Sequence, residues 1–330
     1  MVSHTLAAKA DEQSIIKPGE LIDIVELSPL TLNDRRIYNL LLGHAWDDVA
    51  RGGWHEITKR ELRGSHNVND RVGESIERLM GAIVKVRVTR DGEPSILRVQ
   101  LLAPNSEHVR PDGVLRYRFP PELREIILNS SVFARLHREV MLQLSSKYAL
   151  TLYEVVQKRG NLRHRSSEIF GLDDFRALLG VPDGKLTSWI NFRNKAVTPA
   201  LKEVNALSEF DVEIEPIKEG RKIVRVQLRW ERKDPHRLSR VQRELDFSKV
   251  GRKARMDGTV ETAQASNDPQ GIRPLDNAIF EQVRREHPGY DPYYIEAEWR
   301  RWLSRKDGAP SNPEGSFITF CRKYVKEHPV

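Results

Sequence analysis

The chain has 330 residues, with 54 Lys and Arg against 47 Asp and Glu, a formal net charge of +7 and a pI near 9.4. This length exceeds what one hydrophobic core serves efficiently, so two domains with additional segments are expected. An apolar share of 39%, with 31% charged residues and a mean hydropathy of −0.55, predicts globular domains and excludes a membrane-embedded protein. The positive charge favours a polyanionic partner, because clustered Lys and Arg release the counterions condensed on nucleic acid.

Cysteine occurs once, at Cys321, which excludes an intramolecular disulfide and a Cys-rich zinc site and agrees with a reducing compartment. Residues 1–17 lack the apolar stretch of a secretory signal, and no run approaches the roughly 18–20 apolar residues of a membrane span. We therefore expect a cytoplasmic protein without a membrane partner, and we interpret the polar residues 1–26 as a flexible N-terminal arm.

Helical patterns come first after this arm. Apolar residues at helical spacing predict helices over 30–45 and 69–80, and Thr58 offers the N-cap of a short helix between them. Apolar and basic residues then alternate over 83–88 and again over 96–101, on either side of an Asp-Gly turn, which predicts a β-hairpin. Three helices followed by a basic hairpin is the order of elements in a winged-helix domain, which we assign to residues 27–130.

The same order of elements occurs a second time. A strand over 114–119 and helical patterns over 121–128 and 133–144 lead into it. Helices are then predicted over 148–158, 172–179 and 188–207, and strands over 212–217 and 223–230 flank a positively charged turn. Internal repetition of this kind predicts a second winged-helix domain, residues 131–232.

The amino-acid composition changes in the remainder of the chain. Residues 233–272 are rich in charge, Gly, Ser, Asn and Pro, which predicts a disordered linker with one short helix near 241–247. Three helical patterns separated by Pro and Gly predict a small helical appendage over 273–330. The expected fold class is therefore α+β, with two tandem winged-helix domains, a linker and a C-terminal helical appendage.

The helix predicted over 188–207 has two contrasting faces. One face is apolar and should be core, while the opposite face presents amide, hydroxyl and ammonium groups without a carboxylate. A plain solvated face is usually rich in Glu as well as Lys, so this composition favours contact with base edges and phosphates in a major groove. The residues expected to face DNA here are Ser188, Asn191, Asn194, Lys195, Thr198 and Lys202, with Asn205 on the same face.

Arg193 does not fit this division, because helical geometry places it near the centre of the apolar stripe. It either serves the structure or extends outward to a phosphate, and the sequence favours neither interpretation.

The turn of the hairpin that follows the helix is easier to interpret. Lys218, Arg221 and Lys222 lie at a tight hairpin turn, which would present them to the DNA backbone with little burial.

The first domain gives a weaker signal, because its third helix exposes carboxylates beside its basic residues. Basic side chains could still follow a DNA backbone there, and a dimerising or weaker-binding role is equally compatible with the pattern. The candidates are Lys59, Arg60, Arg63 and Arg71, together with Lys85, Arg87 and Arg90 on the hairpin.

The sequence gives little support for an enzymatic function. A DNA-nicking initiator would need a metal-binding His-x-His pair with a catalytic Tyr, and the chain contains no His-x-His. The segment 180–187, GVPDGKLT, is one residue too short for a phosphate-binding loop and has Leu186 where Ser or Thr should hold Mg²⁺. We therefore expect no catalysis, no metal and no cofactor.

Four segments of the second unit resemble the plasmid replication initiators of the Rep_3 type: LSSKYALTLYE (144–154), FRALLGV (175–181), WINFRNKAVTPA (189–200) and KEGRK (218–222). The resemblance is specific over about 130–230, follows the order of elements over 27–130, and is absent after 233. It implies two winged-helix domains that bind repeated origin sequences (iterons), without catalysis. It also implies that Asn191, Arg193, Asn194 and Lys195, with Lys218, Arg221 and Lys222, make the main DNA contacts.

Partners follow from the same resemblance. It implies monomers that open the origin, in equilibrium with homodimers that repress the initiator's own promoter, and recruitment of the host chromosomal initiator and replicative helicase. The family often has consecutive basic residues where this chain has Asn194, so its DNA repeat is expected to differ. From the residues alone, a winged-helix transcriptional regulator and a structural or partitioning DNA-binding protein remain alternatives.

Overall fold

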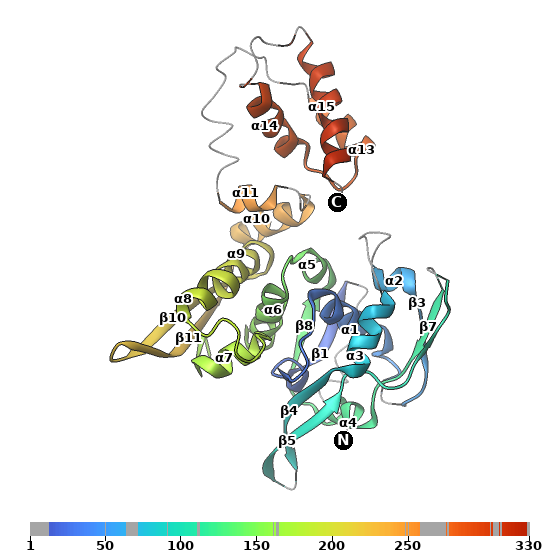
Figure 1. The fold of residues 1–330 in the computed structure, drawn as a ribbon, viewed down its shortest axis with the longest axis vertical. Coiled ribbons are helices and arrows are strands. Elements are labelled where there is room, and N and C mark those ends of the chain that lie inside the picture. The colour runs from blue at the N-terminus through green and yellow to red at the C-terminus, as the bar shows by residue number, and fades with distance from the viewer. Residues whose placement is uncertain are drawn as a thin grey trace. The chain divides into compact units, whose positions relative to one another are not determined.

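The computed structural model describes residues 13–49, 51–63, 72–90, 92–110, 113–160, 162, 165–247, 249, 251–257, 275, 277–303, 305, 310 and 312–328. The chain divides into two units, residues 1–238 and 239–330 (Figure 1). The first unit contains both winged-helix domains, and the second contains a helical bundle.

The first winged-helix domain is built on helices α1 (Leu32–Ala45), α2 (Lys59–Arg63) and α3 (Val72–Gly81), close to the predicted positions. α1 begins at a capping box, in which Thr31 Oγ1 accepts from Asp34 N and Asp34 Oδ2 accepts from Thr31 N. This arrangement satisfies two backbone donors that the first helical turn leaves without partners. The apolar stripe of each helix is buried, as its spacing predicts.

Two small sheets accompany these helices. One has the order β2-β4-β5, formed by β2 (Val25–Glu26), β4 (Ile83–Arg90) and β5 (Glu93–Gln100). The other has the order β3-β7-β6, formed by β3 (His55–Thr58), β7 (Val114–Tyr117) and β6 (Ser106–Glu107). Strands β4 and β5 pair from Ile83 opposite Gln100 to Arg90 opposite Glu93, which confirms the predicted hairpin.

The predicted N-terminal arm is wrong for its described part. β1 (Ser14–Pro18) pairs antiparallel with β8 (Phe133–His137), and every residue of β1 is buried. A 3-10 turn, η1 (Gly19–Leu21), follows it. Ile15 and Ile16 reach the core, but five residues are too few for periodicity to distinguish a strand from a loop. Residues 1–12 lie outside the described part.

The helix predicted over 133–144 is also partly wrong, because its first half is the strand β8 and only α5 (Arg138–Gln143) is helical. In β8 the buried residues Ala134 and Leu136 alternate with more exposed ones, which is the period of a strand with one buried face. The predicted helix before β8 is present as α4 (Pro121–Asn129), with Pro121 in its first turn.

The second winged-helix domain follows the predicted order. It contains α6 (Lys147–Gly160), α7 (Leu172–Leu178), α8 (Trp189–Phe192), one π-helical turn η2 (Arg193–Val197) and α9 (Thr198–Leu207), then the hairpin of β10 (Phe210–Glu219) and β11 (Lys222–Arg232). A strand that the sequence did not reveal, β9 (Ser167–Gly171), completes a sheet of order β10-β11-β9. α6 is buried along most of its length, which fits its nearly continuous apolar sequence.

A buried polar cluster joins α6 to the first strand and the first helix of the unit. Lys17 Nζ lies 2.8 Å from Glu154 Oε2 and donates to Asn39 Oδ1 at 3.0 Å. Asn39 Nδ2 donates to Glu154 Oε1 at 2.6 Å, and an Arg35 nitrogen lies 3.8 Å from Glu154. Arg35 also pairs with Glu26 at 2.6 Å. Glu154 therefore ties α6 to β1 and α1.

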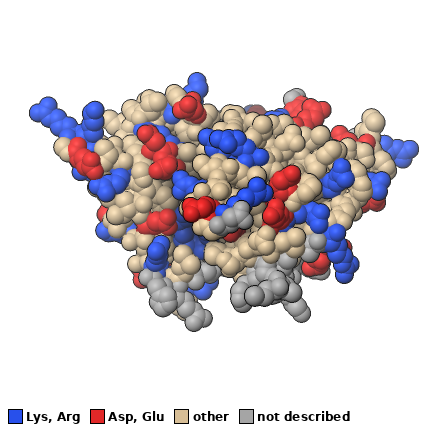
Figure 2. Space-filling view, turned by 90° about the horizontal axis from the view of Figure 1, so that it is seen from below, with Lys and Arg blue, Asp and Glu red and all other residues tan. Residues whose placement is uncertain are grey.

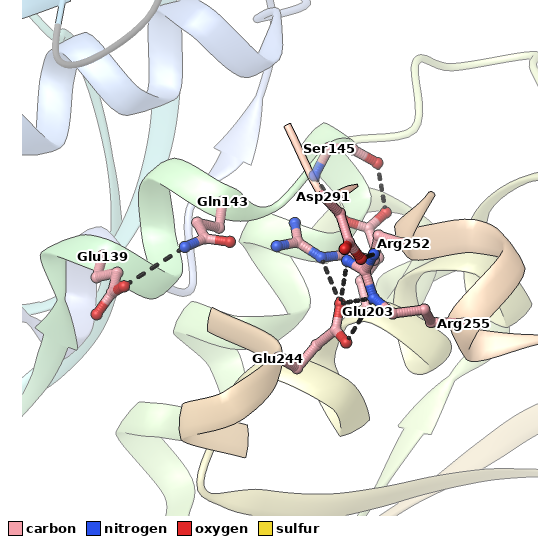
Figure 3. A network of polar contacts seen from close by, with 8 residues as sticks. All are labelled: Glu139, Gln143, Ser145, Glu203, Glu244, Arg252, Arg255 and Asp291. Atoms are coloured by element: carbon pink, nitrogen blue, oxygen red, sulfur yellow. Dashed lines mark hydrogen bonds and ion pairs between the residues drawn. The ribbon is translucent and has the colours of Figure 1, made fainter. Parts of the chain in front are cut away.

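The predicted linker is partly wrong. The short helix expected near 241–247 is present but longer, as α10 (Pro235–Asp246), and a second helix, α11 (Arg252–Met256), forms where disorder was expected. Charged side chains pair here in place of a core: Glu244 accepts from Arg252 and Arg255, and Arg255 reaches Asp291 at 2.7 Å (Figure 3). A composition rich in charge therefore forms ordered helices through ion pairs that depend on tertiary contact. Residues 258–274 lie outside the described part.

The C-terminal unit ends in three helices, α13 (Asn277–Glu286), α14 (Pro292–Leu303) and α15 (Pro313–Glu327), which confirm the predicted appendage. Its buried core is Leu275, Phe280, Val283, Ile295, Trp299, Leu303, Phe317 and Cys321. Burial raises the pKa of the Cys321 thiol to about 12, so this cysteine is a core residue without nucleophilic character.

Candidate nucleic-acid interface

The exposed helix of the second domain begins at a clear N-cap. Ser188 Oγ accepts from Asn191 N at 3.3 Å, which fixes the start of α8. The loop before it turns sharply, with positive φ angles at Gly180 (+70°), Leu186 (+49°) and Gly184 (+71°). Leu186 is the non-glycine residue among these, so the loop stores some backbone strain where it delivers the helix.

The core face of this helix is confirmed. Phe192, Ala196, Val197, Ala200, Val204 and Leu207 are all buried. Phe192 packs edge-on against Phe175 of α7, with ring centroids 6.2 Å apart. The apolar spacing that the sequence displays therefore anchors the helix, and its opposite face is left to solvent.

A π-helical turn decides the position of Arg193. The backbone N–H of Thr198 donates to the carbonyl of Arg193, five residues earlier, so η2 is one residue wider than an α-helical turn. This wider turn changes the angular relation between the residues before and after it. Arg193 is exposed, although regular α-helical geometry placed it in the apolar stripe. Of the two interpretations that the sequence left open, the structure supports the outward one.

The predicted polar face is largely where it was expected. Ser188, Asn191, Asn194, Lys195 and Lys202 are exposed and Thr198 is half-buried. The one carboxylate between residues 188 and 208, Glu203, is buried and accepts from the backbone N and Oγ of Ser145 (Figure 3). The exposed part of this helix therefore carries amides and cations without a competing negative charge.

Asn205 is not part of that face, contrary to prediction. Its side chain pairs with the backbone of Val212, donating to the carbonyl at 2.9 Å and accepting from the N–H at 2.8 Å. Lys233 reinforces the same corner, since its Nζ donates to the carbonyls of Asn205 and Ser208 at 2.6 Å. Burial lowers the pKa of Lys233 to about 8. These contacts fix the wing β10–β11 relative to α9.

The wing ends in a positively charged turn. Gly220 has φ +63°, and the register shifts between Ile217 and Lys218. The three cations predicted for this turn, Lys218, Arg221 and Lys222, are all exposed. Figure 2 shows Lys and Arg projecting at the left end of the visible face, where Figure 1 places the tip of β10–β11. The exposed helix face and the wing together form what we call the major interface.

Arg176 is a positioning residue that sequence reasoning missed. From α7 it reaches the carbonyl of Thr187, directly before the helix N-cap, and Asp173 Oδ1 at 2.5 Å. Its guanidinium also lies over the Phe192 ring, 5.5 Å from the centroid. A basic residue three positions after an acidic one on a short helix was the available signal, but the target carbonyl is a tertiary contact.

Lys59 of the first domain is not available to DNA, which corrects the prediction. It is 7% exposed, and its Nζ lies 2.8 Å from Glu107 Oε2 and donates to the His108 carbonyl at 2.6 Å. The β3-β7-β6 sheet brings these partners over the start of α2. Arg60 is exposed and Arg63 is half-buried, while Arg71 lies outside the described residues.

The third helix of the first domain is poorly suited to contact base edges in a DNA groove. α3 exposes Glu74 and Glu77, and Arg78 is engaged by the buried Asp34 through hydrogen bonds of 2.9–3.0 Å. The first wing keeps more cationic character. Arg87 and Arg90 are exposed and Lys85 is half-buried, with Arg87 lying 3.9 Å from Asp174.

The two domains match two models of one protein family. The model described as "Initiator Replication protein, WH1" matches residues 14–157, and the one described as "Initiator Rep protein, WH2" matches residues 171–230. The chain belongs to the Rep3 family of initiator proteins. The family's first domain thus begins at β1 and includes α6, whereas the sequence prediction divided the domains at 130 and 131.

Solved structures agree with this Rep3 assignment at the level of the fold. The chain is similar to a Pi initiator protein whose structure is titled "in complex with iteron DNA", with 19% identity and a TM-score of 0.52. That similarity covers 68% of this chain and 100% of the other. A structure of domains 2 and 3 of RctB is matched over 68% of this chain and 89% of the other, at 11% identity and a TM-score of 0.37, which is too low to support an inference. The chain matches no curated protein.

Two further observations concern the described residues of the Rep3 chain. Among its described residues, no three or more His, Cys, Asp and Glu side chains gather closely enough to hold a metal ion. No helix in the described ranges combines the length and apolar character that a membrane span requires.

Proposed function

We propose that this initiator binds repeated plasmid origin sequences, iterons, as double-stranded DNA. In this proposal α8, η2 and the start of α9 lie in the major groove, and the wing β10–β11 follows the phosphate backbone. The observation that carries the proposal is the exposed, carboxylate-free face of Asn191, Arg193, Asn194 and Lys195, together with the exposed cations of the wing turn in the same domain. Amides and cations in this arrangement suit base edges and phosphates. The fold shared with the Pi initiator supports it.

The proposed action is binding without a covalent step. The initiator would wrap repeated sites and strain the adjacent A·T-rich duplex, so that the binding free energy opens the origin. It would act in the cytoplasm, recruit the host chromosomal initiator and replicative helicase by protein contact, and exist as monomer and homodimer. The absence of a His-x-His pair from the sequence supports a non-catalytic role.

Sequence discrimination tests the helix. Asn194→Ala with Lys195→Ala should abolish the preference for iteron over random duplex in a gel-shift competition, because a good base contact contributes about 1–3 kcal/mol. Lys326→Ala, an exposed lysine of α15, is the control and should keep that preference. Unchanged discrimination in the double variant would show that this helix does not read the base sequence.

Salt dependence tests the wing. Arg221→Ala should weaken binding to all duplexes and reduce the slope of log affinity against log salt by up to about 0.9, the value for one phosphate contact. An unchanged slope would exclude Arg221 as a phosphate ligand.

A footprint on the plasmid that carries the gene distinguishes initiation from regulation. Tandem direct repeats fit initiation, whereas a single inverted repeat fits a transcriptional regulator.

A further inference from the structure

The C-terminal unit carries a row of aromatic rings at the edge of its core, where Phe320 and Tyr324 pack against the buried residues and remain partly exposed. Phe320, Tyr324 and His328 recur every four residues along α15 and its C-cap, so they lie on one side of the helix. Neighbouring ring centroids in this row are 6.1 Å and 4.3 Å apart. Trp302 of α14 extends the row, 5.6 Å from Phe320, and is 38% exposed. Trp299 and Phe317 are fully buried in the core. We call Trp302, Phe320, Tyr324 and His328 the outer ring row.

The outer ring row lies in a groove between α14 and α15. The groove has a volume of about 640 Å³, and its lining includes Trp302, Phe320, Tyr324 and His328. Its charged lining is Arg301, Arg305, Lys323, Glu298 and Glu327, which is three cations against two carboxylates. Each carboxylate is paired with a cation of the groove: Glu298 lies 2.5 Å from Arg301, and Glu327 lies 3.7 Å from Lys323. The net charge of the lining is therefore positive.

We propose that this groove binds single-stranded DNA, with bases stacked on the outer ring row and phosphates beside the cations. Every base has a π face, so rings of this kind accept any sequence, and Arg side chains add cation–π contact. In a duplex the bases are already stacked and paired, so their faces cannot reach the rings. An amphipathic peptide helix would instead need a dominantly apolar groove, whereas five charged side chains line this one.

This inference rests on the proposed function, since opening of an origin is what would supply the single strand. It adds a second DNA-binding site of different chemistry, on a segment outside the matched Rep3 residues. The major interface would hold the duplex, and the groove would hold an unpaired strand. Binding to both should then be simultaneous.

The test uses the full-length chain and a fluorescein-labelled oligo-dT of about 20 nucleotides, longer than the site of a single binding module. Fluorescence polarisation is measured with the chain already saturated with unlabelled iteron duplex. Trp302→Ala and Phe320→Ala should each weaken oligonucleotide binding by about 5- to 150-fold, the effect of losing one base–ring stack. Trp302→Phe should restore most of it, because a ring is retained.

Charge is tested with a matched pair on α15. Lys323→Ala should weaken oligonucleotide binding, while Lys326→Ala, outside the groove, should leave it unchanged. Binding of the iteron duplex should be the same in all these variants. If the saturated chain does not bind oligo-dT, or if the ring variants bind like wild type, the groove is not a single-strand site, and a groove that takes a peptide would give this result. If the wild-type chain does not bind the iteron duplex at all, the proposed function is refuted instead.

Discussion

Glu154 should be among the most sensitive positions in the first unit. Its carboxylate is completely buried, and Lys17 and Arg35 beside it are 3% and 4% exposed. Glu154→Gln removes the negative charge and leaves two buried cations, one of which retains Glu26. Breaking a buried ion pair in this way costs about 3–5 kcal/mol. Because Gln still offers Lys17 an oxygen and Arg35 keeps its second partner, we expect the lower end, about 3 kcal/mol.

For a unit of this size a loss of about 3 kcal/mol corresponds to a decrease in melting temperature of about 6–12 °C. Thermal unfolding followed by circular dichroism measures it. Glu77→Gln, which neutralises an exposed carboxylate of α3, is the control and should change the stability by no more than about 0.5 kcal/mol. Lys17→Met combined with Glu154→Leu should melt above Glu154→Gln, because the double variant leaves no unpaired ammonium. If Glu154→Gln melts within about 2 °C of wild type, the buried cluster does not hold α6 to β1 and α1.

Three further predictions concern the interface and its support. Arg176→Met should reduce iteron affinity about tenfold, because ordering the start of the helix then costs about 1.4 kcal/mol. The slope of log affinity against log salt should stay unchanged in a titration, and a reduced slope would mean that Arg176 binds phosphate directly. Lys59→Ala should lower the free energy of unfolding by about 1–3 kcal/mol in denaturant titrations, without changing the salt dependence of DNA binding. Arg60→Ala should leave the free energy of unfolding near that of wild type, and equal stability of the two variants would contradict the buried role of Lys59. Burial would raise the pKa of Asp34, but hydrogen bonds from Arg78 and Thr31 outweigh it and hold the pKa below 3.8. Its stabilisation is therefore complete above about pH 4 and lost as the pH falls through that lowered pKa. Asp34→Asn should destabilise the protein at pH 7, and its difference from wild type in unfolding measurements should shrink as the pH falls below 3.8.

Short-range patterns in the sequence predicted the elements that matter most for the interface. The apolar residues of 188–207 define a core face, and all six that the spacing selects are buried. The alternation over 212–217 and 223–230 predicts a hairpin, and the intervening turn exposes its three cations. These features depend on periodicity and turn chemistry, which are properties of neighbouring residues.

The errors have a common physical origin, because each concerns a residue whose state depends on a distant partner. β1 is a strand because β8 pairs with it, more than a hundred residues later. Lys59 is buried because the loop after β6 supplies a carbonyl and Glu107 a carboxylate. The helices α10 and α11 are ordered where Glu244 meets two arginines and one of these meets Asp291.

The sequence by itself therefore determined the order of elements, the two winged helices, the core face of the exposed helix and the charge of the wing. Only the tertiary structure decided where Arg193 points, because a single π-helical turn changes the phase that regular helical spacing assumes. It also decided that Glu203 and Asn205 face inward, toward Ser145 and Val212. Local periodicity fixes which side of a helix is apolar, but the partner of each polar side chain is set by segments that only folding brings near.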